Sequence, residues 1–244
     1  MRRLSVPVLL IVVMSVGAAR GGTVFTLKDL GTLGGTSSYA TGINASGQVV
    51  GWATTPNGLA YAFLYSDGVM KDLNDLIDPT LGWTLLHGSA INNSGQVVGD
   101  AITTSSSISR AFLYSDGEIT DLGTLDGRDT FTSDINDSGQ VVGWARTALY
   151  STYDAFLYSD GVMKDLNDLI DPTLGWNLTR ANAINDSGQI VGFGTNSSGE
   201  THAFLLTPVP APSSLTVLVG VGMMVFGMEW WKKRRLRRRL RTTA

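Results

Sequence analysis

Residues 62–83 read AFLYSDGVMKDLNDLIDPTLGW, and residues 155–176 repeat the same 22 letters without a change. The two passages begin 93 residues apart, so the chain is the product of a duplication. Self-similarity at a fixed spacing is typical of repeat architectures, in which each copy is one supersecondary unit. We therefore expect function to depend on a surface that the repeats build together.

Two shorter phrases divide the duplication further. The phrase I-N-x-S-G-Q-[VI]-V-G begins at Ile43, Ile91, Ile135 and Ile184. The phrase A-F-L-Y-S-D-G begins at Ala62, Ala111 and Ala155, and is shortened to AFLL at Ala203. Together they define four units of about 46 residues, near the period of a four-stranded propeller blade.

Each phrase has the pattern of a β-hairpin. Asp-Gly between strand-like runs, as at Asp67–Gly68, favours a type I′ turn because both central residues need positive φ. In the other phrase, Asn-x-Ser-Gly supplies residues that accept left-handed geometry, and the Asn side chain can bond its own backbone. Two hairpins per unit predict four strands per unit.

The sequence therefore predicts an all-β fold of four repeats within residues 22–208. A single small sheet cannot bury both faces, so neighbouring units must cover one another. Residues 24–30 are similar to the second half of an AFLYSDG hairpin, and residues 203–206 form a first half. We expect strands from both termini to close a small four-bladed β-propeller, with an open β-solenoid as the alternative.

The N-terminus has the composition of a secretory signal peptide over residues 1–19. Arg2 and Arg3 provide the positive region, an apolar run follows, and Gly17-Ala18-Ala19 offers a small-residue cleavage site. A retained anchor is the alternative, although the apolar run is short for crossing a membrane.

The C-terminus, residues 209–244, has the composition of a membrane anchor. A proline-punctuated stretch at 209–214 precedes an apolar segment at 215–231, for which we expect a transmembrane helix, and a basic tail follows at 232–241. A basic run can also bind nucleic acid. Its place directly after an apolar run favours retention of the tail in the cytoplasm.

These C-terminal features resemble the PEP-CTERM sorting signal of bacterial envelope proteins, with Ala211 standing where that family has its namesake Glu. The matching motif residues are Val209, Pro210, Pro212, Ser213 and Ser214. The resemblance implies processing by an exosortase-type enzyme, with the C-terminal helix holding the chain in the inner membrane beforehand. It also implies secretion to the cell envelope or extracellular matrix of a Gram-negative bacterium.

The four units are similar to the HAF repeat family of extracellular proteins, which carries the same A-F-L-Y…D-L-G…I-N-x-x-G-Q-V-V-G pattern. The similarity extends over nearly all of the body between the two terminal segments. It indicates membership of a family and implies no biochemical activity.

Charge is divided between the body and the tail, although the net charge is only −3. Of the 18 basic residues, eight lie in 232–241 and three precede residue 21, which leaves seven against all 21 acidic residues. A strongly acidic body repels nucleic acid and anionic membrane surfaces. We expect no nucleic-acid partner.

The identical copies contain a D-x-x-D-x-x-D series that is a candidate calcium site, because Ca²⁺ prefers several oxygen ligands. Its spacing matches neither an EF-hand nor a nonapeptide calcium repeat, and ordinary turn chemistry is the alternative. We expect no cofactor, and treat these carboxylates only as weak candidates: Asp72, Asp75, Asp78, Asp165, Asp168 and Asp171.

Two pairs of tryptophans occupy equivalent positions, Trp52 with Trp144 and Trp83 with Trp176. Exposed tryptophans can stack on sugar rings, whereas buried ones pack between blades. Both interpretations stay open at this point.

The sequence contains no recognisable catalytic constellation. His87 and His202 are the only histidines and occupy non-equivalent positions, and cysteine is absent. We therefore expect a secreted or surface-displayed protein without enzymatic activity that binds, or contributes to, an envelope or extracellular polysaccharide matrix. The alternatives are an extracellular hydrolase that acts on polysaccharide through a carboxylate pair, and a purely structural matrix component.

Overall fold

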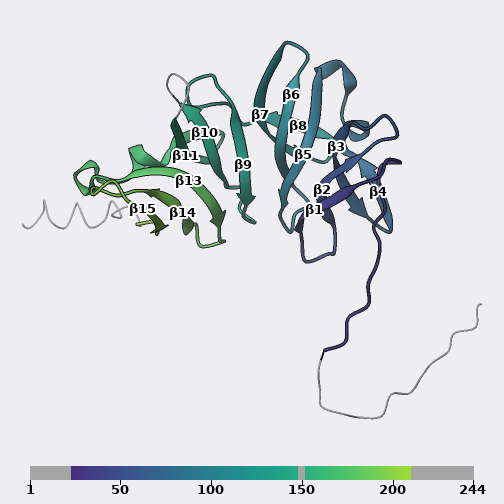
Figure 1. The fold of residues 1–244 in the computed structure, drawn as a ribbon, viewed down its shortest axis with the longest axis horizontal. Coiled ribbons are helices and arrows are strands. Elements are labelled where there is room, and N and C mark those ends of the chain that lie inside the picture. The colour runs from purple at the N-terminus through teal and green to yellow at the C-terminus, as the bar shows by residue number, and fades with distance from the viewer. Residues whose placement is uncertain (1–22, 148–151, 210–244) are drawn as a thin grey trace, which may run out of the picture.

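The structure, a computed structural model, describes residues 23–147 and 152–209. Its strands form four antiparallel sheets, named A to D in chain order (Figure 1). Sheet A contains β1 (Ser38–Ile43), β2 (Val49–Thr54), β3 (Ala60–Ser66) and β4 (Val69–Asp72). Sheet B contains β5 (Trp83–Ile91), β6 (Val97–Thr103), β7 (Ser106–Ser115) and β8 (Glu118–Asp121). Sheet C contains β9 (Thr130–Ile135), β10 (Val141–Thr147), β11 (Thr152–Ser159) and β12 (Val162–Asp165). Sheet D contains β13 (Asn177–Ile184), β14 (Ile190–Thr195) and β15 (Thr201–Leu206).

Each sheet is a meander in which consecutive strands pair, so the expected all-β fold with four repeated units is confirmed. Short 3-10 helices connect sheet A to sheet B and sheet C to sheet D. They are η1 (Leu73–Leu76), η2 (Pro79–Leu81), η3 (Leu166–Leu169) and η4 (Pro172–Leu174). The 22-residue passage therefore begins in the third strand of one sheet and ends where the next sheet begins.

Both expected hairpin turns form. Asp67 and Gly68 have φ of 54° and 85°, the positive pair that a type I′ turn requires. In the other hairpin the carbonyl of Asn44 accepts a hydrogen bond from Gly47, while its side-chain Oδ1 accepts from the backbone N–H of Gln48. Local chemistry thus sets the register of both hairpins.

The glycine of each Q-V-V-G phrase is required by close packing. A Cβ on Gly99 would lie 1.9 Å from the carbonyl oxygen of His87 and 2.7 Å from the ring of Phe112. The corresponding glycines, Gly51, Gly143 and Gly192, meet the same kinds of neighbour. Each phenylalanine therefore packs edge-on against a strand that has no side chain at this point.

The sheets pack face against face, and each junction has its own apolar core. Between sheets A and B, Val50 and Ala62 meet Leu85 and Val97, and all four are fully buried. Equivalent residues fill the junctions of B with C and of C with D. Burying such side chains stabilises a fold by roughly 1.5–3 kcal/mol each, so these cores hold the array together.

A ladder of asparagine side chains also links the sheets. The Nδ2 of Asn44 donates to the carbonyl of Asn92, that of Asn92 to Asn136, and that of Asn136 to Asn185, each at 3.1 Å. Asn44, Asn92 and Asn136 are buried, whereas Asn185 is exposed at the end of the array. The turn residue of each hairpin is therefore also a contact to the next sheet.

The closure expected between the two termini is not present in the described part of the chain. Sheet D has three strands, β15 pairs with β14 alone, and residues 24–30 belong to no strand. Sheets A and D lie at opposite ends of the longest axis (Figure 1), so the two half-hairpins do not meet. The expectation rested on sequence similarity, which carries no information about the rotation between neighbouring sheets.

The two expected terminal segments lie outside the described residues, apart from Val209. This applies to the signal peptide at 1–19, to the remaining sorting-motif residues and to the transmembrane helix at 215–231. Within residues 23–147 and 152–209, no helix is long and apolar enough to cross a membrane.

Candidate functional site

The first two strands of every sheet carry one equivalent pair of side chains. The pairs are Tyr39 opposite Trp52, His87 opposite Asp100, Phe131 opposite Trp144, and Arg180 opposite Phe193. Sheets A and C thus place two aromatic rings here. Sheet B places two ionisable side chains and sheet D places one cation beside one ring.

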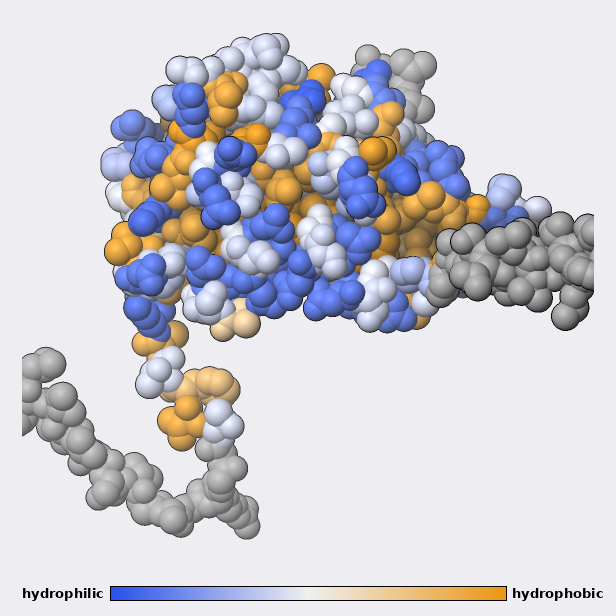
Figure 2. Space-filling model, turned by 180° about the vertical axis from the view of Figure 1, so that it is seen from behind, coloured by the Kyte–Doolittle hydropathy of each residue, from blue (hydrophilic) through white to orange (hydrophobic). Residues whose placement is uncertain are grey.

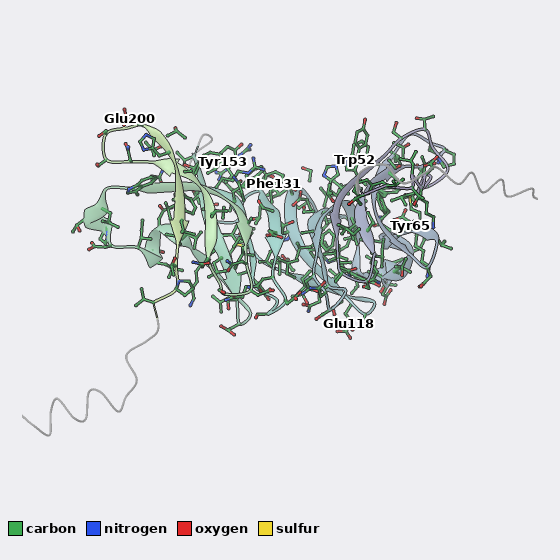
Figure 3. All side chains as sticks on the ribbon, turned by 90° about the horizontal axis from the view of Figure 1, so that it is seen from below. Trp52, Tyr65, Glu118, Phe131, Tyr153 and Glu200 are labelled. Atoms are coloured by element: carbon green, nitrogen blue, oxygen red, sulfur yellow. The ribbon has the colours of Figure 1, made fainter. Side chains whose placement is uncertain are left out.

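These strands border a hollow of about 420 Å³ to which all four sheets contribute. It is lined by Thr41, Trp52, His87, Gly88, Ser89, Asp100, Thr132, Ser133, Arg180 and Asn182. Trp52, Phe131 and Tyr153 lie along one edge of the array (Figure 3). A concave site with a few convergent polar groups is the usual form of a binding site.

Aromatic rings are stacked at both sheets that carry two of them. The ring centroids of Tyr39 and Trp52 lie 4.4 Å apart, and those of Phe131 and Trp144 lie 4.1 Å apart. The guanidinium of Arg180 lies 4.7 Å from the centroid of Trp144. This cation–π contact fixes the position of the cation at the rim of the hollow.

Asp100 is the carboxylate of this hollow. Its Oδ1 accepts a hydrogen bond of 3.0 Å from the backbone N–H of Thr132, which belongs to sheet C. Burial raises the pKa of Asp100 to about 7, against the opposing effects of that hydrogen bond and of Arg180. The side chain is therefore partly protonated near neutral pH and can both donate and accept a hydrogen bond.

Other polar groups at the hollow are also available to a ligand. Burial lowers the pKa of His87, which favours its neutral form. The Oγ of Ser133 and the indole Nε1 of Trp144 are buried and have no hydrogen-bond partner in the described part of the chain. Buried polar atoms are nearly always paired in proteins, and Ser133 lines the hollow, so its Oγ is a candidate for a contact with a bound molecule.

The aspartates of the D-x-x-D-x-x-D series have different structural roles. Asp72 caps η1 by accepting from the N–H of Asn74, and Asp78 caps η2 by accepting from the N–H of Thr80. Burial raises the pKa of Asp72, whereas the bonds from Thr80 lower that of Asp78. Asp165 and Asp171 repeat these roles and these pKa shifts in sheet C.

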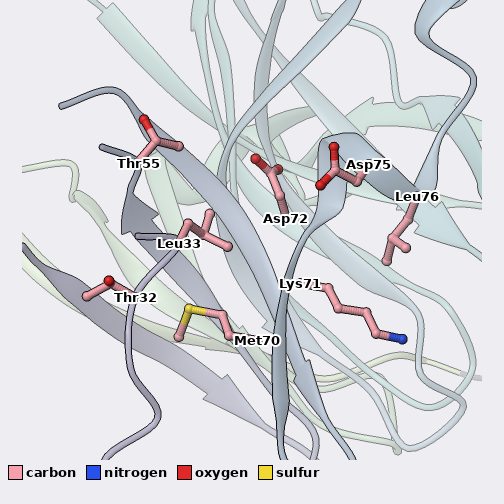
Figure 4. A pocket seen from close by; sticks show the side chains of 8 residues that line it. All are labelled: Thr32, Leu33, Thr55, Met70, Lys71, Asp72, Asp75 and Leu76. Atoms are coloured by element: carbon pink, nitrogen blue, oxygen red, sulfur yellow. The ribbon is translucent and has the colours of Figure 1, made fainter. Parts of the chain in front are cut away.

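Two members of each series nevertheless border one open hollow. In sheet A its volume is about 540 Å³, and its lining is Thr32, Leu33, Thr55, Met70, Lys71, Asp72, Asp75 and Leu76 (Figure 4). Asp165 and Asp168 border a counterpart of about 560 Å³ in sheet C. Among residues 23–147 and 152–209, no group of three or more His, Cys, Asp or Glu side chains is placed to hold a metal ion.

The structure separates the two tryptophan pairs. Trp83 and Trp176 pack against the apolar cores of the A–B and C–D junctions. Trp52 lines the hollow, and Trp144 lies beneath Arg180 at its rim. Trp52 is therefore the tryptophan that a ligand in the hollow can contact directly, whereas Trp144 supports Arg180.

Sequence inspection did not single out Asp100 or Arg180. The sequence does contain a signal for Asp100. The residues that follow the four V-V-G or I-V-G phrases are Trp52, Asp100, Trp144 and Phe193. Asp100 is thus the one acidic residue at a position that is otherwise aromatic.

No family model and no curated protein matches the sequence. A solved structure of TolB from Acinetobacter baumannii matches with 10% identity and a TM-score of 0.44, covering 72% of this chain and 44% of its own. The β-propeller domain of the Trilobed protease from Pyrococcus furiosus matches with 10% identity and a TM-score of 0.32, covering 71% of this chain and 68% of its own. This chain thus spans less than half of the TolB chain.

Proposed function

We propose that this chain is a secreted or surface-displayed β-repeat protein, without enzymatic activity, that binds a polysaccharide of the cell envelope or extracellular matrix. The binding site is the hollow bordered by the inner strands of all four sheets. Sugar rings present apolar C–H faces edged by hydroxyl groups. Stacked aromatic rings beside a few polar side chains match that chemistry.

The observation that carries this proposal is the departure from the repeat at one position. A residue that serves folding alone is expected to recur in every unit, as Gly99 does in Gly51 and Gly143. The inner pairs instead change from aromatic in sheets A and C to His87 with Asp100 in sheet B. Such variation on a constant scaffold is expected of a recognition surface.

Arg180 and Asp100 narrow the ligand chemistry. Arg180 is the basic residue that lines the hollow, and Asp100 supplies a carboxyl group that is partly neutral at pH 7. A glycan that carries occasional carboxylates, such as a uronic acid polymer, fits a site with one cation and a protonated acid better than a polycation does.

Binding is tested on an array of envelope and matrix glycans with the purified full-length chain. We expect binding that Trp52→Ala and Asp100→Ala each reduce at least tenfold. A matched control is Leu81→Ala, because Leu81 is about half exposed (52%) on a connection outside the hollow. Equal binding by all four proteins would contradict the proposal.

A polysaccharide hydrolase is the second candidate, favoured by the raised pKa of Asp100. A carboxylic acid that is half protonated near pH 7 is suited to protonate a leaving group. Most glycosidases require a second carboxylate about 5–10 Å away, whereas Asp100 is the only acidic side chain lining this hollow within the described residues. Release of reducing ends that Asp100→Asn abolishes would favour the hydrolase over the binding protein.

The proposed route to the exterior follows from the two ends of the chain. A signal peptide directs export, the C-terminal helix holds the chain in the inner membrane, and an exosortase-type enzyme removes the sorting segment. The strands end at Leu206, so a cut near Val209 leaves every sheet intact. Intact-mass analysis of secreted protein is expected to show a species ending near Val209. A full-length membrane species would contradict this route.

In the proposed working form, residues 26–29 supply the missing fourth strand that completes sheet D as a propeller blade. These residues read TLKD and correspond to VMKD of β4 and β12 and to EITD of β8. The edge of β15 is where such a strand is missing.

A further inference from the structure

The outer face of sheet D has the composition of a buried junction. In sheets A, B and C the second valine of the Q-V-V-G phrase (Val50, Val98 and Val142) is completely buried against the next sheet. The equivalent Val191 of sheet D is 43% exposed. Ala203 is likewise exposed, whereas its equivalents in the other sheets are buried. Apolar surface gathers at this end of the molecule (Figure 2).

The outer face of sheet A likewise exposes a residue that is buried at the internal junctions. The isoleucine that begins each I-N phrase is 5–7% exposed in sheets B, C and D, where it packs against the preceding sheet. In sheet A the equivalent Ile43 is 69% exposed. The two ends of the array are thus the two halves of the junction that occurs three times inside it.

The asparagine ladder stops at the same place. Asn185 Nδ2 bonds Gln189 within its own turn, without the bond to a following sheet that its three equivalents make. At the other end, the buried turn of Asn44 has the geometry that accepts such a bond in Asn92 and Asn136. Inside the array a second bond joins the turns of sheets A and B, from the backbone N–H of Ala45 to the side-chain Oδ1 of Asn93. Ala45 has no side-chain oxygen to accept such a bond, so a junction onto sheet A contains only the bond of the asparagine ladder.

The segment before sheet A belongs to the preceding blade. Leu30 and Leu33 pack on the outer face of sheet A, around Phe63 and Tyr65. Their sequence equivalents, Leu122 and Leu125, follow β8 and pack in the junction between sheets B and C. A sheet seated before sheet A would therefore receive its fourth strand from residues 26–29.

Sheet D of the same chain does not reach that position. Sheets A and D are at opposite ends of the long axis in both Figure 1 and Figure 3. The three internal junctions repeat the same kinds of contact, and closing the chain on itself would require at least one of them to change. A second copy requires no change in any of them.

We propose that a second copy of this chain docks head to tail, with its sheet A on the outer face of sheet D and its residues 26–29 paired with β15. This inference rests on the proposed completion of sheet D and is independent of polysaccharide binding. In the register of β3 with β4, Lys28 of one copy pairs with Leu205 of the other and Leu27 pairs with Leu206. Such a heterologous contact repeats into a closed ring or an open filament.

Association is tested by sedimentation velocity of the full-length chain over a range of concentrations. We expect wild type to form assemblies that Ile43→Glu and Val191→Glu each abolish. At concentrations where wild type is a monomer, thermal unfolding should be unchanged, because both side chains are exposed in the single chain. Leu174→Glu is the matched control, since Leu174 is 56% exposed on η4, the connection between sheets C and D. A monomer at all concentrations, or assembly that the end-face variants leave intact, would overturn the proposal.

Cross-linking distinguishes a second copy from closure within one chain. The sequence contains no cysteine, so Lys28→Cys and Leu205→Cys introduce the only thiols of their chains. Mixing the two single variants with a short bis-maleimide is expected to give a covalent dimer that forms far less in either variant alone. Ser198→Cys, at the far end of the β14–β15 hairpin, replaces Leu205→Cys as the negative control. A cross-link confined to the double variant as a monomer would establish closure in one chain and overturn the second copy.

Discussion

The side-chain Nδ2 of Asn92 donates to the carbonyl oxygen of Asn136 at 3.1 Å, and this bond joins the hairpin turn of sheet B to that of sheet C. The same amide bonds Gln96, and its Oδ1 accepts from the backbone N–H of Ser94. One buried side chain thus both shapes its own turn and fixes the neighbouring sheet. Turn formation and sheet stacking are coupled at this residue.

Replacement of Asn92 is expected to be more costly than replacement of Asn185. Asn92→Ala leaves the backbone N–H groups of Ser94 and Gln96 without their partner and removes the bond to the next sheet, which should lower the free energy of unfolding by about 2–3 kcal/mol. Asn185→Ala removes only the bonds within an exposed turn and should cost about 1 kcal/mol. Urea denaturation at low protein concentration measures both. Equal losses would show that the link between sheets contributes nothing.

The glycine of the Q-V-V-G phrase is predicted to be essential for folding. Gly99→Ala would place a methyl group 1.9 Å from the carbonyl oxygen of His87, so we expect a loss of more than about 3 kcal/mol, or no folding. Gly88→Ala is the control on the neighbouring strand, because its nearest neighbours lie at 3.3 Å and need to move only slightly. Thermal unfolding compares the two. A tolerated Gly99→Ala would contradict the tight packing of Phe112 on this strand.

Asp100 gives the stability a defined pH dependence. Its pKa is raised in the folded chain to about 7, so between about pH 4 and pH 7 the folded state binds more protons than the unfolded state. Stability from this group is therefore fully present below pH 4 and is lost as the pH rises toward 7, by at most about 4 kcal/mol. Burial lowers the pKa of His87, so this residue makes stability rise with pH. Wild type and Asp100→Asn both contain His87, so its effect cancels when the two are compared.

Asp100→Asn isolates this effect, because the amide oxygen can still accept from Thr132. We expect the variant to gain stability over wild type as the pH rises from 4 to 7, with a constant difference above pH 8. Denaturant midpoints at a series of pH values measure the difference. A difference that does not change with pH would show that Asp100 titrates normally.

Truncation to alanine is predicted to affect stability and ligand binding differently in the two tryptophan pairs. Trp83→Ala removes a side chain that packs on the core between sheets A and B, so a loss of about 2–3 kcal/mol is expected, with ligand binding retained in the folded fraction. Trp52→Ala removes a ring stacked on Tyr39 in the hollow, so binding should be lost with about 1 kcal/mol of stability. Parallel unfolding and glycan-binding measurements separate the two. Binding lost in both variants alike would remove the distinction.

The hairpins, the four units and the antiparallel sheets could be predicted from sequence because their causes are local. Asp67 and Gly68 specify a turn by φ preference alone, and the period of the phrases specifies how often the turn recurs. The rotation between sheets could not be predicted in this way. It depends on how side chains such as Val50 and Leu85 interlock across a junction, and similar residues fit more than one rotation.

The candidate site was predictable only in part. The tryptophans are candidates on sequence grounds because they recur at equivalent positions, whereas Asp100 and Arg180 have no equivalent in the other units. Their partners, Thr132 and Trp144, come from another sheet, and the burial that raises the pKa of Asp100 exists only after the sheets have stacked. Positions that are constant among the four units indicate the fold, whereas positions that vary among them indicate the candidate binding site.

The indole N–H resonances of the tryptophans report on ligand binding in the hollow. The ¹H–¹⁵N spectrum of the full-length chain is recorded during titration with a bound glycan, and the indole signals are assigned by Trp→Phe substitution. We expect the signals of Trp52 and Trp144 to shift, while those of Trp83 and Trp176 stay in place. Binding that moves Trp83 and Trp176, or that leaves Trp52 and Trp144 unmoved, would contradict it.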